Sequence, residues 1–299
     1  KYLDCFAGVS VINCGHCNPE ITEKVTKQVE TLQHVCNIYL TENFVNLAEK
    51  LAEVTPGDLQ KSFFCSTGTE ATEGAALLAT IHTGSSEFIA LRNGLHGRTK
   101  LTMSLTGIGM WRTDPNPVGG IQFALNPYCY RCPLGKTHPE CGLACADEVE
   151  TIIRTATSGR PAAFIAESIQ GNAGIIVPPE GYFQRVKEII SAYGGLFIAD
   201  EVQTGFARTG RMFAIEHFGV APDIMTMAKA LGNGAPISAF IATPEIADTY
   251  TKPGASTLGG NPVSTTAGLE VIRYIEEHDL IGNADRRGAQ LRAGLEEIQ

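Results

Sequence analysis

The chain has 299 residues, 43% of them hydrophobic and 18% charged, so it is long enough to bury a sizeable core in one large or two ordinary domains. Its 32 acidic and 23 basic side chains give a formal net charge of -9 with no lysine- or arginine-rich run, which argues against nucleic acid as a partner. No apolar run approaches the ~20 residues that span a bilayer, so we expect no membrane partner either.

The cysteines and the two ends of the sequence bear on compartment and completeness. Nine cysteines are too few for a disulfide scaffold in a chain of this length, and their odd number favours a reducing compartment, most simply the cytoplasm. Cys5, Cys36 and Cys65 stand in apolar surroundings and are expected to be buried thiols. The chain begins at Lys1 on a strand-like run and stops within a charged helical pattern, so we expect a fragment of a longer protein.

Two helices, a strand and a third helix are predicted in the first 84 residues. Apolar side chains recur at helical spacing over 21–32 and over 43–54, and Pro56 and Gly57 end the second pattern. A short apolar strand follows over 61–65, and a turn leads from it into a helix that ends near Thr83.

The turn at 66–69 has two interpretations. Free N–H groups at a helix N-terminus, the positive end of the helix dipole and neighbouring hydroxyl groups together make a natural phosphate site. The alternative is an ordinary capped helix, with Thr69 as the N-cap and Glu73 nearby. The turn alone leaves both open.

A further strand is predicted over 88–91 and a loop over 94–98. His96 lies in this loop and is either catalytic or a structural hydrogen-bond donor between two glycines. The stretch from there to Phe123 contains many glycines and prolines, so we expect loop with short helices.

Five potential metal ligands then fall within 17 residues, namely Cys129, Cys132, His138, Cys141 and Cys145. Cys-x2-Cys followed by Cys-x3-Cys is roughly the spacing of a structural zinc site or of another thiolate-bound metal. The eight residues between the two pairs are fewer than in a usual zinc ribbon or finger. We therefore expect no metal, with Cys129, Cys132, Cys141 and Cys145 as the alternative site.

Strands and helices alternate through the rest of the chain, which predicts an α/β fold with a mainly parallel sheet covered on both faces. Glu167 and Asp200 each end a strand, and Lys229 follows another. Because open α/β sheets bind ligands at the carboxyl ends of their strands, Asp200 and Lys229 are expected in one crevice. The predicted elements are strands over 162–167, 196–199, 224–227 and 237–242, and helices over 147–157, 181–193, 263–277 and 284–298.

A lysine near a buried acid and a phosphate-type helix terminus together suit pyridoxal phosphate. With these residues the sequence closely resembles the class III, fold type I pyridoxal-phosphate aminotransferases, a group that includes ω-amino acid, 4-aminobutyrate, ornithine and alanine–glyoxylate aminotransferases. The resemblance runs from about Tyr2 to Glu277. It rests on the motifs Ser66-Thr67-Gly68-Thr69-Glu70-Ala71, His96-Gly97-Arg98, Glu167-Ser168-Ile169-Gln170-Gly171, Asp200-Glu201-Val202-Gln203-Thr204-Gly205-Phe206, Ala228-Lys229 and Ser256-Thr257-Leu258-Gly259-Gly260-Asn261-Pro262.

The resemblance implies a fold and a reaction. An N-terminal segment over 1–40 would precede a large α/β domain over 41–277 with a seven-stranded, mainly parallel sheet, and 278–299 would begin a smaller α+β domain. The family reaction moves an amino group from an amino acid or ω-amino compound to pyruvate, glyoxylate or 2-oxoglutarate by a ping-pong mechanism. The usual C-terminal lobe, with an arginine that grips the substrate carboxylate, has no counterpart in this sequence.

The resemblance also implies two catalytic residues. Lys229 would form the Schiff base with the cofactor and then move a proton at the substrate. Asp200 would pair with the pyridine nitrogen.

The other implied cofactor residues surround these two. The phosphate would bind Thr67, Gly68 and Thr69, and Thr257 would reach it from the neighbouring subunit of a homodimer or dimer of dimers. The ring would contact Val202, Gln203, Leu95, His96 and Glu167. Leu95 stands where an aromatic residue is usual, so aliphatic packing or another ring would cover that side. Arg208 matches the family pattern but is expected to be structural.

Alternatives to amino transfer share the same cofactor and scaffold. An amino-acid racemase, a dialkylglycine-type decarboxylase or a phospholyase would need the same residues, because the pocket decides which bond at Cα breaks. A nicotinamide-dependent protein lacks support, since no G-x-G-x-x-G follows a strand.

Overall fold

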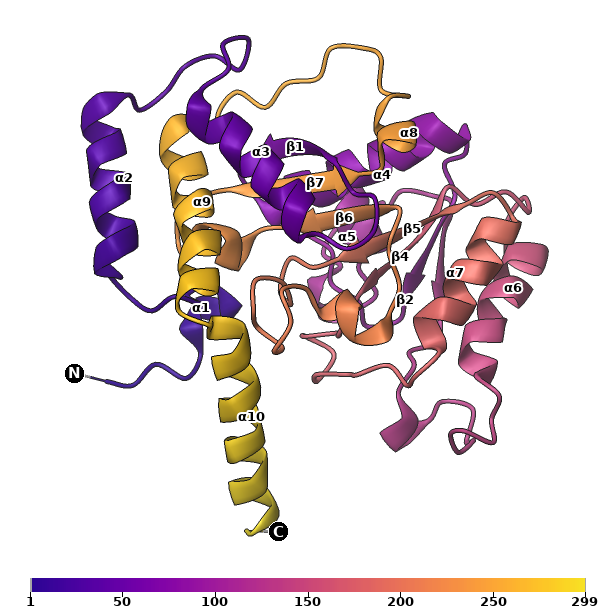
Figure 1. Cartoon of the computed structure of the whole chain (residues 1–299). Coiled ribbons are helices and arrows are strands. Elements are labelled where there is room, and N and C mark those ends of the chain that lie inside the picture. Colours follow the sequence, from indigo (N-terminus) through magenta and orange to yellow (C-terminus); the bar gives the residue numbers. More distant parts are fainter. Residues whose placement is uncertain (1, 299) are drawn as a thin grey trace.

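The computed structural model describes residues 2–298, which form a seven-stranded sheet with helices on both faces (Figure 1). The strand order is β1-β7-β6-β5-β4-β2-β3. Strands β3, β2, β4, β5 and β6 run parallel, whereas β7 runs antiparallel to both β6 and β1. This confirms the predicted mainly parallel α/β fold. The strands are β1 (Lys61–Cys65), β2 (Phe88–Leu91), β3 (Ile121–Ala124), β4 (Ala163–Glu167), β5 (Leu196–Asp200), β6 (Ile224–Met227) and β7 (Ser238–Ala242).

The central strands are continuous apolar runs because both of their faces are covered. In β5, Phe197 and Ala199 point to one core cluster, while Leu196 and Ile198 point to the other. Helices α3, α6, α7 and α9 pack on the first face, and α4, α5 and α8 pack on the second. The helices are α1 (Ala7–Ser10), α2 (Pro19–Thr31), α3 (Glu42–Val54), α4 (Gly68–Thr83), α5 (Lys100–Leu105), α6 (Ala144–Ala156), α7 (Tyr182–Ala192), α8 (Pro244–Ala247), α9 (Pro262–Glu277) and α10 (Leu280–Glu296).

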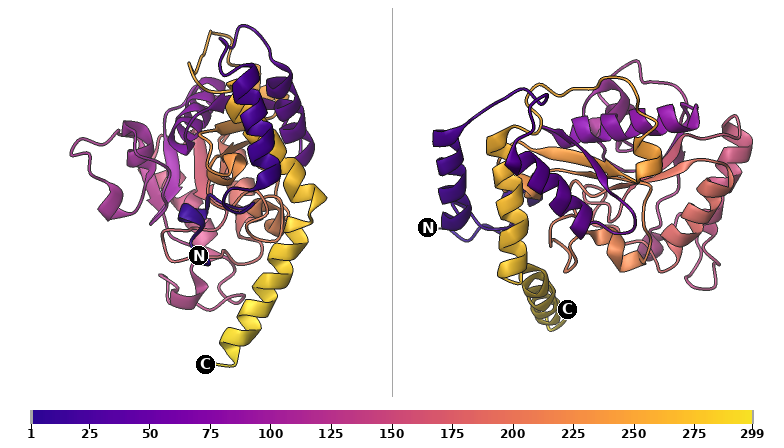
Figure 2. Two further views of the ribbon diagram at one scale, coloured as in Figure 1. Left: turned by 90° about the vertical axis from the view of Figure 1, so that its left-hand side faces the viewer. Right: turned by 45° about the horizontal axis from the view of Figure 1, so that its top comes forward.

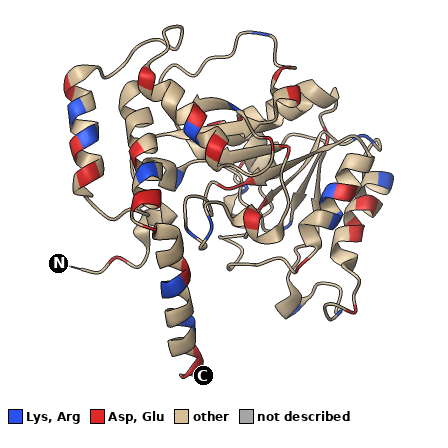
Figure 3. Cartoon of the chain, in the orientation of Figure 1, with Lys and Arg blue, Asp and Glu red and all other residues tan. Residues whose placement is uncertain are grey.

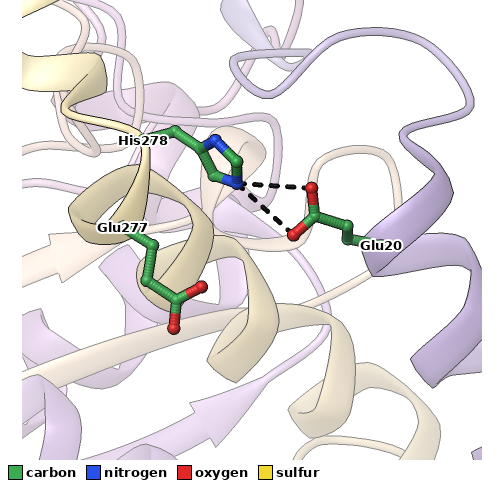
Figure 4. A group of neighbouring side chains, drawn as sticks. All are labelled: Glu20, Glu277 and His278. Carbon is green, nitrogen blue, oxygen red and sulfur yellow. Dashed lines mark hydrogen bonds and ion pairs between the residues drawn. The ribbon is translucent and has the colours of Figure 1, made fainter.

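Helices from the two ends of the sequence, α2 and α9, lie at one side of the sheet. Helix α2 packs along α9 rather than on the strands, and α10 projects away from the body (Figures 1 and 2). The imidazole of His278, at the end of α9, lies 3.3 Å from the carboxylate of Glu20 at the start of α2, with Glu277 alongside (Figure 4). Acidic and basic residues are interspersed on α2, α6 and α7 (Figure 3). No helix within residues 2–298 has the length and apolar character needed to cross a membrane.

Several expectations about local structure are wrong. Residues 121–124 form the edge strand β3 rather than loop, because pairing with β2 stabilises a segment that is only partly buried. The strand-like N-terminal run contains the short helix α1 instead of a strand. Cys5 and Cys36 are exposed, while Cys65 is buried as expected. The domain bounds at residues 40 and 277 stay predictions.

Candidate active site

The carboxyl ends of three neighbouring strands bring the predicted acids and the lysine together. Strands β4 and β5 are parallel and in register, so Glu167 pairs with Asp200 across the sheet. Strand β6 lies beside β5, and Lys229 comes two residues after its last residue, Met227. Two carboxylates and one amine therefore meet at one edge of the sheet, as expected for an open α/β fold.

Asp200 is buried and held by two hydrogen bonds. Its Oδ2 lies 2.7 Å from Nδ1 of His96, and its Oδ1 accepts the N–H of Val202 at 3.1 Å. His96 is positioned in turn by its own N–H, which donates to the hydroxyl of Thr106. His96 and Asp200 are each about 3% exposed, so this contact is shielded from water and fixes the direction of the carboxylate.

Lys229 occupies a strained backbone position at the start of a short 3-10 helix (Lys229–Gly232). Its φ of 46° lies in the left-handed region, which is unusual for a residue with a side chain and is typical of functional sites. Burial lowers the pKa of its amine, although the negative charges of Asp200 and Glu167 act in the opposite direction. The amine is therefore neutral and nucleophilic at a lower pH than that of a surface lysine.

Glu167 connects the loops that follow β2 and β4. Its carboxylate accepts the N–H of Leu95 at 2.9 Å and the N–H of Gly171 at 2.9 Å. The side chain is buried, and burial raises its pKa. These bonds hold Leu95 and His96 over the edge of the sheet where Lys229 lies.

The N-terminus of α4 is capped by Thr67 and Glu70, which corrects the expectation that Thr69 is the cap. The N–H of Glu70 donates to the hydroxyl of Thr67 at 3.3 Å, and the N–H groups of Ser66 and Thr67 donate to the Glu70 carboxylate. The N–H groups of Gly68 and Thr69 have no hydrogen-bond partner in the described part of the chain. A helix N-terminus with two such free donors is suited to an anion.

A cavity of about 450 Å³ joins these elements. Eight of the eleven predicted cofactor residues line it, namely Thr67, Gly68, Thr69, Leu95, His96, Asp200, Val202 and Lys229. Glu167 lies behind the loop carrying Leu95, and Gln203 packs against Gly171. Thr257 is exposed and outside the cavity of its own chain.

Two further residues at the cavity carry chemistry that the sequence interpretation did not assign. Arg98 and Trp111 both line it. The Arg98 side chain is exposed and has no ion-pair partner among residues 2–298. The position of Arg98, two residues after His96, was a usable signal, whereas nothing in the sequence around Trp111 pointed to the cavity.

The remaining predicted residues lie elsewhere. Arg208 hydrogen-bonds the side chain of Asn13, which agrees with a structural role. The four loop cysteines line a separate small cavity and are free thiols in this structure.

Comparisons with known proteins give one family. The family model described as aminotransferase class-III matches residues 1–299. The chain is 43% identical over 300 residues to alanine–glyoxylate aminotransferase 2 homolog 2, mitochondrial, of Arabidopsis thaliana, covering 100% of this chain and 62% of that protein. It is 40% identical to a leucine/methionine racemase of Thermococcus litoralis, covering 97% of this chain and 66% of the relative.

Solved structures agree with this relationship. An (S)-enantioselective omega-transaminase from Thermomicrobium roseum superposes with a TM-score of 0.92 at 33% identity, covering 97% of this chain and 68% of that one. An amine transaminase from an uncultivated Pseudomonas species, in its PLP-bound form, superposes with a TM-score of 0.91 at 31% identity, covering 97% and 70%. The chain belongs to the class III aminotransferases.

Proposed function

We propose that the protein is a pyridoxal-phosphate-dependent aminotransferase that moves an amino group from an amino acid or ω-amino compound to an oxo acid. One observation carries the proposal: Lys229, Asp200 and the free N–H groups of α4 meet in a single cavity of about 450 Å³. Class membership and the transaminase structures of similar fold support the same reaction.

The residues present fit pyridoxal phosphate. The N–H groups of Gly68 and Thr69 suit a phosphate, and Asp200 suits a protonated pyridine nitrogen. Val202 and Leu95 offer apolar side chains for the two faces of a ring. When bound, the cofactor supplies an aldehyde that accepts the amino group and a ring that withdraws electrons from the substrate Cα.

Each side chain then has a definite task. Asp200 would hold a proton at the ring nitrogen of the cofactor, and His96 keeps the carboxylate in place through the 2.7 Å contact. Lys229, whose pKa is lowered by burial, would move the proton at the substrate Cα. Glu167 orders the loop that carries Leu95 and His96.

The cavity also suggests the class of substrate, through Arg98. Arg98 lines it and has no ion-pair partner among residues 2–298, so its guanidinium suits the carboxylate of an amino or oxo acid. We propose a homodimer, or a dimer of dimers, in which Thr257 completes the phosphate site of the neighbouring subunit. The odd number of cysteines supports a cytoplasmic location.

Racemisation is the second candidate, because a leucine/methionine racemase is 40% identical to the chain. Both reactions begin with removal of the proton from Cα by Lys229. They differ in where a proton is returned, so product analysis separates them.

Spectroscopy of the purified protein tests the cofactor. Wild-type protein mixed with pyridoxal phosphate is expected to absorb in the visible range and to retain the cofactor covalently after borohydride, whereas Lys229→Ala is not. A wild type that binds no cofactor would refute the proposal.

Product analysis then tests the reaction. Incubation with an L-amino acid and pyruvate, glyoxylate or 2-oxoglutarate is expected to yield the new amino acid. Loss of optical activity without amino transfer to any oxo acid would favour racemisation instead.

A further inference from the structure

Two buried hydroxyl groups reach the first turn of α4, where the cofactor phosphate is proposed to bind. Ser238, on β7, donates to the C=O of Thr67 at 2.7 Å. Thr72, in the second turn of α4, donates to the C=O of Gly68 at 3.0 Å. Ser238 and Thr72 are both fully buried, so these hydrogen bonds are shielded from water.

The fold brings Ser238 to this turn from a distant strand. Ser238 pairs with Cys65, the last residue of β1, which lies two residues before Thr67. It is on the same face of β7 as Phe240, the face that α4 covers. Gly74 allows this close packing, since a Cβ atom there would collide with the Phe240 ring. The Ser238 hydroxyl therefore ties the start of α4 to the central sheet.

The two carbonyl groups belong to the same peptide units as the two free N–H groups of α4. One unit joins the C=O of Thr67 to the N–H of Gly68, and the next joins the C=O of Gly68 to the N–H of Thr69. Neither N–H group has a hydrogen-bond partner in the described part of the chain. A hydrogen bond to the oxygen of an amide draws electron density out of the group, so its N–H becomes a stronger donor. The two hydroxyl groups thus act on the donors that suit a phosphate.

The position of these bonds in the helix decides what they do. Threonines within helices commonly bond the carbonyl four residues earlier, and Thr80 does so with Ala76 at 2.9 Å. There the N–H of the same peptide unit lies inside the helix and has its own partner. In the first turn the same kind of bond acts on an N–H group that is left free for a ligand.

We propose that Ser238 and Thr72 are positioning residues, which orient and polarise the two amide groups that hold the cofactor phosphate. The inference rests on the proposed function, because it requires pyridoxal phosphate in this cavity. It adds two hydroxyl groups that act through the backbone of Thr67, Gly68 and Thr69 and contact neither cofactor nor substrate.

Titrations of cofactor-free protein with pyridoxal phosphate and with pyridoxal, which lacks the phosphate, test this inference. Ser238→Ala and Thr72→Val each remove one hydroxyl and should weaken binding of pyridoxal phosphate by about 3- to 10-fold. Binding of pyridoxal should stay as in the wild type, because it has no phosphate for these amides to hold. Thr72→Ser keeps the hydroxyl and should bind both compounds as the wild type does. Thr80→Val is the matched control, since it removes a similar hydrogen bond two turns further along α4, and should also bind normally.

The ³¹P resonance of bound pyridoxal phosphate is a readout that a purely structural role would not move. It should shift in Ser238→Ala and Thr72→Val and stay in place in Thr72→Ser and Thr80→Val. The comparison of Thr72→Val with Thr72→Ser leaves the sheet intact, so it decides the question even where Ser238→Ala does not fold.

The outcomes separate this inference from the proposed function. A wild type that binds no pyridoxal phosphate would sink both. Where the wild type binds it, an unchanged affinity in Thr72→Val and Ser238→Ala, an equal loss for pyridoxal, or an equal loss in Thr72→Ser or Thr80→Val would overturn this inference alone.

Discussion

Replacing Gly68 by alanine tests whether the N-terminus of α4 and Val202 form two sides of one cofactor site. A Cβ atom on Gly68 would lie 2.8 Å from Cγ1 and 3.2 Å from Cγ2 of Val202, and 3.4 Å from Cβ of Ala228. The closest approach is shorter than carbon atoms tolerate, so Val202 has to move. Its direction of escape is the cavity, which both residues line.

We therefore expect Gly68→Ala to weaken cofactor binding more than it lowers the stability of the folded protein. In cofactor-free protein Val202 can lean into open space, whereas a bound ring would occupy that space. Overpacking of this kind costs about 1–3 kcal/mol, which corresponds to roughly 5- to 150-fold weaker binding of pyridoxal phosphate. The melting temperature of the cofactor-free protein should change little.

Absorbance titration of cofactor-free protein with pyridoxal phosphate measures this effect. Gly109→Ala is the matched control, because a Cβ atom there meets nothing within 4 Å, and it should bind as the wild type does. Adding Val202→Ala to Gly68→Ala removes both Cγ atoms and should recover part of the lost affinity. Wild-type affinity in Gly68→Ala, or no recovery in the double variant, would refute the reasoning.

Three other substitutions probe the charged groups of the site. Burial lowers the pKa of Lys229, so the folded state binds the proton of this amine less tightly than the unfolded state does. This difference lowers the free energy of unfolding at neutral pH, and the loss disappears as pH rises toward ~10.4, the ordinary pKa of a lysine. Lys229→Met should therefore stabilise the cofactor-free protein against urea more at about pH 7 than at about pH 10, and an equal gain at both would contradict this. Glu167→Gln should lower the free energy of unfolding by about 1–3 kcal/mol in the same assay, because the amide oxygen can accept only one of the N–H groups of Leu95 and Gly171. An unchanged midpoint of urea unfolding would count against those hydrogen bonds. Asp200→Asn should reduce the rate of amino transfer by on the order of 10²-fold in steady-state assays, and a near-normal rate would exclude Asp200 as the partner of the ring nitrogen.

The sheet was predictable because its strands carry a strong local signal. Segments covered on both faces become short continuous apolar runs, and β4, β5 and β6 all show this pattern. The rule that ligands bind at the carboxyl ends of parallel strands then placed Asp200 and Lys229 at one edge, and the resemblance implied that Glu167 lies near them. The register of β4 and β5 agrees with that expectation.

Contacts between distant segments were less predictable because nothing local encodes them. His96 and Asp200 are 104 residues apart, and the resemblance implied that each is near the cofactor without implying that they touch. Strand β3 is a similar case, since three of its four residues are only partly buried and the segment acquires strand structure by pairing with β2. Trp111 reaches the cavity from a short 3-10 helix (Gly109–Trp111) in a stretch without periodicity.

The adjacent acids Asp200 and Glu201 show why the structure was needed to assign their tasks. Successive side chains at the end of a strand point in opposite directions, so only one of the two can face the cavity. Glu201 is buried elsewhere and accepts hydroxyl groups from Ser168 and Thr204 and N–H groups from Ala214 and Ile215, which occupies both of its oxygens. Each oxygen of Asp200 has one partner, which leaves acceptor capacity toward the cavity. Asp200 is thus able to bind a protonated ring nitrogen, whereas Glu201 holds the segment after β5 in the position that this task requires.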